Sequence, residues 1–163
     1  FLDNFRKVEN NFMCYFIGGP SGKSGIEYLE ELKKVVIDLE LESYVEFVDI
    51  ISQTKIRDLL NKSKLLIHTS KFETFGLVAA EALAMGVPVL TTNRGSLLEI
   101  VENSINGYQS ENLIDRNVNN FVKELLNNDE KFNEIMLNCF EKSKGYNWSN
   151  TAIEIENLYS NFI

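Results

Sequence analysis

Mostly apolar runs alternate with longer segments of helical periodicity, and this alternation constrains the fold of the chain more than any other feature. The runs are residues 12–17, 45–48, 65–68 and 87–91. Strands that are apolar along their length and separated by helices are typical of a parallel sheet covered on both faces. The sequence therefore predicts an α/β fold with a doubly wound parallel sheet. In such sheets, ligands bind at the carboxyl ends of the strands.

Helices are predicted between these strands and after the last one. Ser24 is the expected N-cap of the first long helix, because Glu27 would complete a capping box with it. Further helices are expected at residues 52–60, 76–85, 118–126, 130–140 and 149–162. The last three of these form an extra helical segment at the carboxyl end.

The start of the chain resembles the end of a helix. Leu2, Phe5 and Val8 have helical spacing, but no N-cap precedes Phe1. We therefore expect a fragment of a longer protein that lacks its own first strand. The 163 residues are 44% hydrophobic and 25% charged, which predicts a single domain over residues 1–163.

Composition also narrows the classes of partner. The net charge of −8 argues against a nucleic-acid partner, because nucleic-acid-binding domains carry a basic face. Cys14 and Cys139 are far apart and are expected to be buried free thiols in a reducing, cytoplasmic protein. With His68 as the single histidine, no metal site is expected, and we expect His68 itself to be structural.

Residues 18–24 follow a predicted strand, open a helix and end in Gly-Lys-Ser. A phosphate-binding P-loop needs four residues between its first glycine and the Gly-Lys pair, which would place that glycine at Ile17. A nucleoside triphosphatase is therefore the least favoured function. A plain strand-to-helix turn and a glycine-rich edge that a nucleotide approaches both remain open.

The predicted helix at residues 76–85 is apolar on nearly every side, which predicts that it is buried. Glu81 lies in its middle. Either its side chain reaches solvent or a basic partner, or it accepts hydrogen bonds from ligand hydroxyls such as a ribose diol.

The loop before this helix combines a carboxylate with a helix start. The backbone amides of Phe75, Gly76 and Leu77 are predicted to form the free N-terminus, which attracts phosphate groups. Gly76 would let a phosphate approach without hindrance from a Cβ atom. Glu73 flanks this site, and a helix-capping contact is its alternative role.

Glu73 and Glu81 are separated by seven residues in an order that resembles the E-x7-E motif of group 1 (family 4) retaining glycosyltransferases with the GT-B fold. The resemblance continues through residues 16–20, 28–32, 82–89, 95–101 and 106–108, and through Trp148. It implies a Rossmann-like, carboxyl-terminal, nucleotide-sugar-binding domain that lacks the amino-terminal acceptor domain. The chain alone is then expected to be inactive.

The resemblance also implies residue roles. Glu73 is the implied catalytic-site residue and contacts hydroxyls of the donor sugar, while Glu81 holds the ribose. The implied donor-binding positions are Gly19, Ile50, Ile51, Phe75, Gly76, Leu77 and Glu81. Among these, Gly19 and the amides of residues 75–77 lie near the diphosphate, and residues 50–51 lie near the base.

Two departures from the family pattern affect the donor site. Asp49 stands where the family usually has glycine, and the family's basic residues that clamp the diphosphate lie upstream of Phe1. Lys23, Lys71 and Arg94 are the nearby basic residues, but they are not assigned that role.

The expected substrate is a nucleotide-sugar, with UDP-sugars favoured over GDP- and ADP-sugars, and no cofactor or metal is expected. The acceptor, a glycan, lipid-linked sugar or polysaccharide precursor, would bind the missing domain. A peripheral contact of the parent protein with the inner membrane surface is left open. The alternatives are a non-catalytic nucleotide-binding module and a glycoside hydrolase that uses Glu73 and Glu81.

Overall fold

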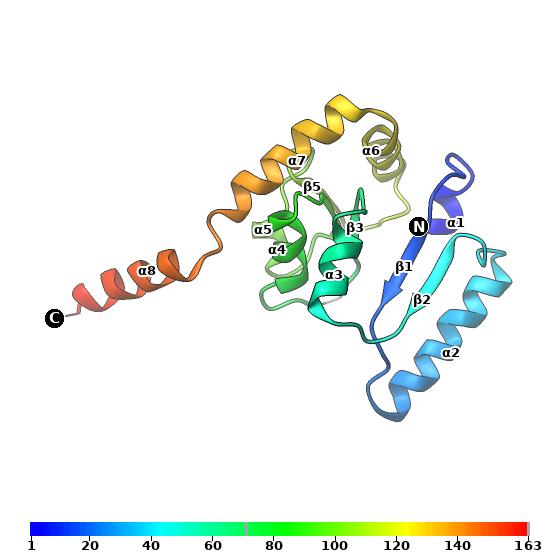
Figure 1. The fold of residues 1–163 in the computed structure, drawn as a ribbon, viewed down its shortest axis with the longest axis horizontal. Coiled ribbons are helices and arrows are strands. Elements are labelled where there is room, and N and C mark those ends of the chain that lie inside the picture. The colour runs from blue at the N-terminus through cyan, green and yellow to red at the C-terminus, as the bar shows by residue number, and fades with distance from the viewer. Residues whose placement is uncertain (71, 163) are drawn as a thin grey trace. The chain divides into compact units, whose positions relative to one another are not determined.

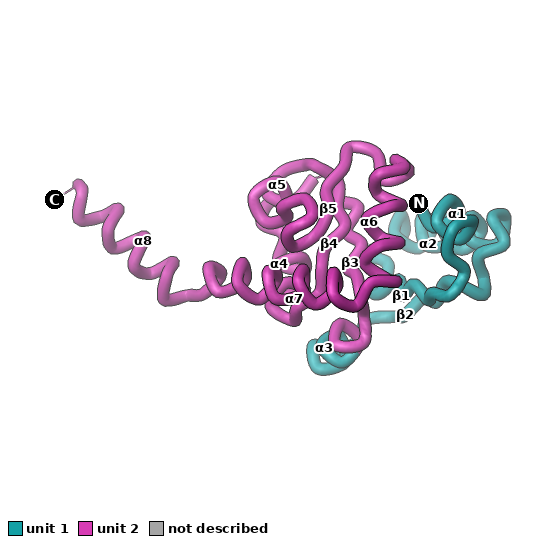
Figure 2. The backbone as a smooth tube through the Cα atoms, turned by 90° about the horizontal axis from the view of Figure 1, so that it is seen from above, with its two compact units in different colours: residues 1–58 teal, residues 59–163 magenta. Residues whose placement is uncertain are grey.

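The computed structural model describes residues 1–70 and 72–162, and the chain forms two compact units, Phe1–Asp58 and Leu59–Ile163 (Figure 2). Lys71 and Ile163 lie outside the described residues. Figure 1 labels the helices and strands of both units.

The first unit contains a two-stranded parallel sheet. Its elements are α1 (Leu2–Phe5), β1 (Cys14–Ile17), α2 (Gly22–Asp38) and β2 (Val45–Val48). Cys14 pairs with Val45 and Ile17 with Val48, so the two strands end side by side. At the other end of the sheet, the ring of Phe12 stacks on Tyr44 and contacts Phe5 at a tilted angle. Helix α3 (Gln53–Leu60) leads from this unit into the second.

The second unit contains a three-stranded parallel sheet in the order β3-β4-β5. Its elements are β3 (Leu66–His68), α4 (Leu77–Ala84), β4 (Val89–Thr92), α5 (Leu97–Ile100), β5 (Gly107–Ser110), α6 (Arg116–Asn127), α7 (Asp129–Ser143) and α8 (Trp148–Ser160). Strand β4 is central and its first three residues are buried. Helices α4 and α7 pack against each other, and α6 packs against β5 (Figure 1).

The predicted α/β fold with parallel strands is confirmed, and the strands are divided between two small sheets. Strand β5 was not predicted, because Gly107–Ser110 carries no apolar run. It pairs in parallel with β4, with Gly107 opposite Val89, and only glycine allows this approach, because a Cβ atom on Gly107 would lie 2.1 Å from the carbonyl oxygen of Val89.

The predicted start of α2 is wrong by three residues. The helix begins at Gly22 with Ser21 as N-cap, so Ser24 lies inside the first turn. Ser21 has an extended backbone, and no side chain caps the helix. The residues Pro20 and Gly22 thus set the turn, and the expected capping box of Ser24 and Glu27 does not form.

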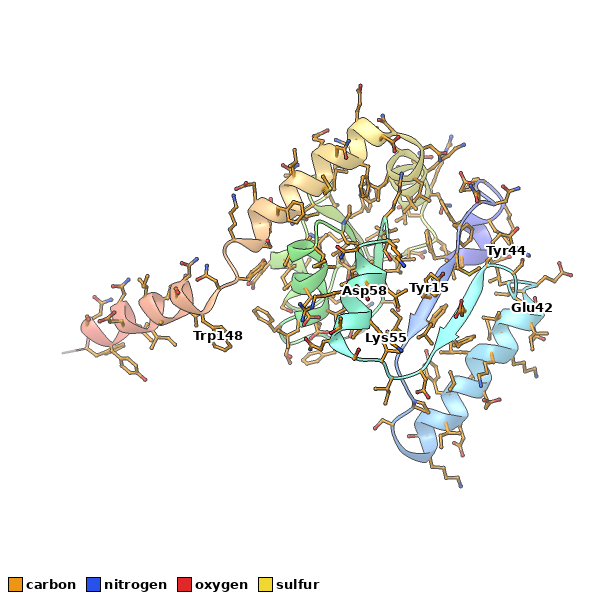
Figure 3. All side chains as sticks on the ribbon, viewed as in Figure 1. Tyr15, Glu42, Tyr44, Lys55, Asp58 and Trp148 are labelled. Atoms are coloured by element: carbon orange, nitrogen blue, oxygen red, sulfur yellow. The ribbon has the colours of Figure 1, made fainter. Side chains whose placement is uncertain are left out.

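Helix α8 matches the predicted terminal helix, but none of its described residues is buried. Trp148 projects from its first turn with 89% of its surface exposed (Figure 3). Within residues 1–70 and 72–162, no helix combines the length and the hydropathy needed to cross a bilayer.

We expect Leu83→Ala to lower the free energy of unfolding by about 2–5 kcal/mol, because the side chain of Leu83 is fully buried on α4. The matched control is Leu98→Ala on α5, where the side chain is 51% exposed. That control should cost no more than about 0.5 kcal/mol. Urea-induced unfolding of both variants checks the prediction, and equal losses would show that α4 is not a core helix.

Candidate functional site

Two threonine hydroxyls of β4 hold the start of the loop between β3 and α4 by hydrogen bonds. Thr91 Oγ1 donates a hydrogen bond to the carbonyl oxygen of His68 at 2.8 Å, and Thr92 Oγ1 donates one to that of Ser70 at 2.7 Å. Thr91 is completely buried. The central strand β4 therefore holds the first residues of the loop through side chains as well as through the strand pairing.

The end of the same loop is held by the segment after β4. The amide of Ser96 donates to the carbonyl oxygen of Glu73 at 3.4 Å, and the Ser96 hydroxyl lies 3.5 Å from that oxygen. Gly95 has φ +60°, and a Cβ atom there would lie 2.4 Å from the same carbonyl oxygen. This close approach requires glycine and sets the position of Glu73.

The carboxylate of Glu73 accepts hydrogen bonds with both of its oxygens. Oε1 accepts from the amides of Thr74 at 3.0 Å and Phe75 at 3.4 Å, and Oε2 lies 3.1 Å from Nε2 of His68. The contact with His68 is the largest cause of a lowered pKa of Glu73, and the backbone amides of Gly76, Phe75 and Thr74 also lower it, against partial desolvation. Glu73 is therefore ionised at neutral pH.

Helix α4 begins directly after this carboxylate without a side-chain cap. Its N-cap, Gly76, has φ +87°, and the first helical hydrogen bond runs from the amide of Ala80 to the Gly76 carbonyl oxygen. No hydrogen bond joins the amides of Leu77, Val78 and Ala79 to another described residue. These uncapped amides and the helix dipole make a positive helix end.

The reason for glycine at position 76 differs from the one expected. Gly76 is buried, and a Cβ atom there would meet Leu97 at 3.1 Å and Ile100 at 3.0 Å. Packing against α5 and the left-handed backbone thus require glycine here, whatever binds at the helix end.

The prediction that α4 is buried on all sides is wrong. Ala79, Ala82 and Leu83 are buried, in line with the packing of α4 on α7, β3 and β4, whereas Leu77 and Glu81 are exposed. These exposed residues show that an apolar composition alone did not determine burial. The side chain of Glu81 reaches solvent, which is the first of the two roles left open for it. The same exposure leaves its carboxylate accessible to a ligand, so the second role stays a prediction.

In the first unit, the structure brings two of the predicted site residues together. A Cβ atom on Gly19 would lie 2.8 Å from the Ile50 side chain and 3.1 Å from Oδ1 of Asp49. Ile50 is 79% exposed, and its amide donates to Asp49 Oδ1 at 2.7 Å. Ile51 follows with partial burial. The loops after β1 and β2 therefore meet closely at the carboxyl ends of the strands.

Sequence reasoning did not predict which residues hold the loop in the second unit. These are the Glu73 partner His68 and the loop-holding residues Thr91, Thr92, Gly95 and Ser96. Their position at the carboxyl ends of neighbouring strands was the available signal, since loops at one sheet edge meet there.

The structure does not assign a diphosphate-binding role to the basic residues considered for it. Lys23 and Arg94 are exposed, and Lys71 lies outside the described residues. Throughout the described ranges, no group of three or more His, Cys, Asp and Glu side chains is arranged to hold a metal ion.

The fold and the E-x7-E segment agree with one family of enzymes. The sequence profile described as "Glycosyl transferases group 1" matches residues 1–141. The chain therefore belongs to the group 1 glycosyltransferases, and it corresponds to their carboxyl-terminal domain within a GT-B fold.

Three similar proteins illustrate this. A D-inositol 3-phosphate glycosyltransferase of Nocardioides sp. is 30% identical over 159 residues, covering 94% of this chain and 34% of that enzyme. Anabaena HepE in complex with UDP has a TM-score of 0.84 at 25% identity, covering 98% of this chain and 44% of that one. Its complex with UDP-glucose gives a TM-score of 0.82 at 26% identity, with the same coverage.

The third is the C-terminal domain of the group 1 protein LpcC from Francisella tularensis. It has a TM-score of 0.74 at 21% identity, covering 89% of this chain and 76% of that one, and so shares the fold. The chain thus spans between a third and a half of the length of the Nocardioides and Anabaena proteins.

We expect Gly95→Ala to destabilise the protein more than Gly22→Ala. Both glycines have nearly the same positive φ, +60° and +66°, but a Cβ atom meets the Glu73 carbonyl only at Gly95 and open space at Gly22. The difference isolates the close approach and should be about 1–3 kcal/mol, the usual cost of overpacking. Urea unfolding measures it, and equal losses would contradict the loop contact.

Proposed function

We propose that this chain binds the nucleotide-diphospho-sugar donor of a retaining glycosyl transfer reaction. The observation that carries the proposal is the ionised carboxylate of Glu73 directly before the uncapped N-terminus of α4, in a chain of the group 1 glycosyltransferase family. The two features offer an acceptor for sugar hydroxyls and a positive site for a diphosphate within one loop and helix.

The N-terminus of α4 is the proposed diphosphate site. The amides of Leu77, Val78 and Ala79 make no hydrogen bond to another described residue, so they are available to phosphate oxygens. The helix dipole adds to this attraction and would stabilise the nucleoside diphosphate as it departs. Of the amides of Phe75, Gly76 and Leu77 that the family resemblance implies for this end of the donor, we assign that of Leu77, because the amides of Phe75 and Gly76 bond the Glu73 carboxylate.

Glu73 is the proposed partner of the sugar. Each carboxylate oxygen has two acceptor sites, so Glu73 retains capacity beyond the bonds from His68, Thr74 and Phe75. An ionised group here would also stabilise positive charge that develops at the anomeric carbon. Within the alternative of a glycoside hydrolase, the lowered pKa of Glu73 suits the ionised nucleophile or base rather than the acid, which must carry a proton.

Glu81 is the proposed partner of the ribose. Leu77 and Glu81 are four residues apart on α4, so they share one helix face, and both are exposed. A carboxylate on that face can accept bonds from both hydroxyls of a ribose diol. This assignment places the ribose on the same helix that would bind the diphosphate.

The remaining donor contacts are assigned to the first unit. We propose that Gly19 lies near the diphosphate and that Ile50 and Ile51 contact the base, where the exposed Ile50 side chain offers apolar surface. The UDP and UDP-glucose complexes of Anabaena HepE support a UDP-sugar over a GDP- or ADP-sugar. The acceptor, a glycan, lipid-linked sugar or polysaccharide precursor, is assigned to the rest of the protein.

We expect the full-length protein to bind UDP-glucose or another UDP-sugar more tightly than the GDP- and ADP-sugars. Binding should survive EDTA, because the proposed site uses amides and carboxylates on sugar and ribose rather than a metal. Calorimetry with the three nucleotide classes, with and without EDTA, measures both. Failure to bind any nucleotide-sugar would refute the proposed function, and loss of all binding in EDTA would refute the metal-free site.

We expect Glu73→Gln and Glu81→Gln to impair the full-length enzyme differently. Glu81→Gln should weaken the binding of the donor and the binding of UDP alike, by about 1.5–3 kcal/mol, because both molecules contain the ribose. Glu73→Gln should lower kcat and leave the UDP inhibition constant unchanged, because the sugar is absent from UDP.

Steady-state kinetics of donor turnover and UDP inhibition constants measure these effects. Glu124→Gln, an exposed glutamate on α6, is the matched control and should behave as the wild type. If Glu73→Gln weakens UDP binding as much as Glu81→Gln does, the assignment of Glu73 to the sugar is wrong.

A further inference from the structure

His68 is the only histidine of the chain, and its imidazole contacts the carboxylate that the proposed function depends on. Nε2 lies 3.1 Å from Oε2 of Glu73, and the two side chains are 20% and 24% exposed. The contact links the end of β3 to the loop five residues later. Both side chains are partly buried, so solvent screens this contact less than it screens a fully exposed pair.

The direction of this hydrogen bond follows from the state of Glu73. A glutamate with an ordinary pKa is already ionised at neutral pH and has no proton to donate, so Nε2 of His68 carries the hydrogen and donates it. Both the Nε2–H tautomer and the imidazolium satisfy this condition. Oε1 is held at the same time by the amides of Thr74 and Phe75, so the carboxylate is fixed at both oxygens.

The backbone of His68 does not depend on its imidazole. His68 pairs in register with Thr91 of β4, and its carbonyl oxygen accepts the Thr91 hydroxyl. Replacing the imidazole therefore leaves the strand and its anchor in place. What the imidazole adds is the bond to Glu73.

We propose that His68 is a positioning residue, whose Nε2–H holds Oε2 of Glu73 so that the carboxylate meets the donor sugar in one orientation. The inference rests on the sugar-binding role of Glu73 proposed above. The bond also stabilises the charged form of the carboxylate. Among the described residues, His68 is the titratable side chain in contact with Glu73, and the other donors are the amides of Thr74, Phe75 and Gly76.

Three variants of the full-length protein separate positioning from simple structural support. His68→Leu removes the donor, and His68→Gln keeps an N–H donor at a similar reach. Lys131→Met is the matched control, because it removes the partner of a different glutamate, Glu134, at 2.9 Å on α7. Thermal unfolding should be nearly unchanged in all three.

The first measurement does not require activity. In protein with ¹³C-labelled glutamate, the Glu73 carboxyl resonance is assigned by its absence from Glu73→Gln and is titrated with pH. Because the His68 donor lowers the pKa of Glu73, the midpoint should rise in His68→Leu. It should stay lower in His68→Gln and be unchanged in Lys131→Met. An unchanged midpoint in His68→Leu overturns the inference.

The second measurement is UDP release from UDP-glucose as a function of pH. His68→Leu should lower kcat about tenfold, as expected for loss of a hydrogen bond to a charged group. The fall in activity at low pH should begin at a higher pH than in the wild type. The UDP inhibition constant should not change, and His68→Gln should recover most of kcat.

The two measurements distinguish the failure of the inference from the failure of the proposed function. If Glu73→Gln keeps wild-type UDP release, the proposed role of Glu73 is wrong, whatever the NMR midpoint. If Glu73→Gln loses activity but His68→Leu keeps it, the role of His68 is wrong. Equal losses of kcat in His68→Leu and His68→Gln would also overturn it.

Discussion

The carbonyl oxygens of the loop after β3 are held by groups of β4 and the segment that follows it, and the candidate site in the second unit depends on these bonds. Thr91 and Thr92 bind the start of the loop, and Ser96 binds the backbone of Glu73. Backbone that such bonds already order, as at Ser70 and Glu73, costs little further entropy when a ligand binds to it. The parallel pairing of β3 and β4 makes this possible by ending both strands at one edge.

The charge at this edge follows from the same arrangement. Glu73 is close enough to the start of α4 that three successive amides lower its pKa, together with His68. The helix then presents its remaining amides without a cap. An ionised carboxylate and a positive helix end thus stand next to each other in a domain of net charge −8. In such a domain, local dipoles rather than overall charge are what can attract an anion.

Helix α4 has an exposed face. Leu77, Val78 and Glu81 are exposed, although the helix is apolar over most of its length. The chain spans about a third to a half of the length of its longer relatives. The proposed donor site accounts for an apolar helix face that carries a single carboxylate, since the ribose and diphosphate would lie on it.

The sequence by itself determined the alternation of strands and helices, the parallel class of the sheet, the E-x7-E segment and the family. These properties are local, because apolar runs, helical spacing and motif order are each set within a few residues. Only the tertiary structure decided the position of β5, the exposure of Glu81 and the contact between His68 and Glu73. Each of these depends on which backbone or side chain lies alongside: Val89 beside Gly107, α7 on one face of α4, and β4 beneath the loop. Such neighbours are far apart in the chain, and no local pattern specifies them.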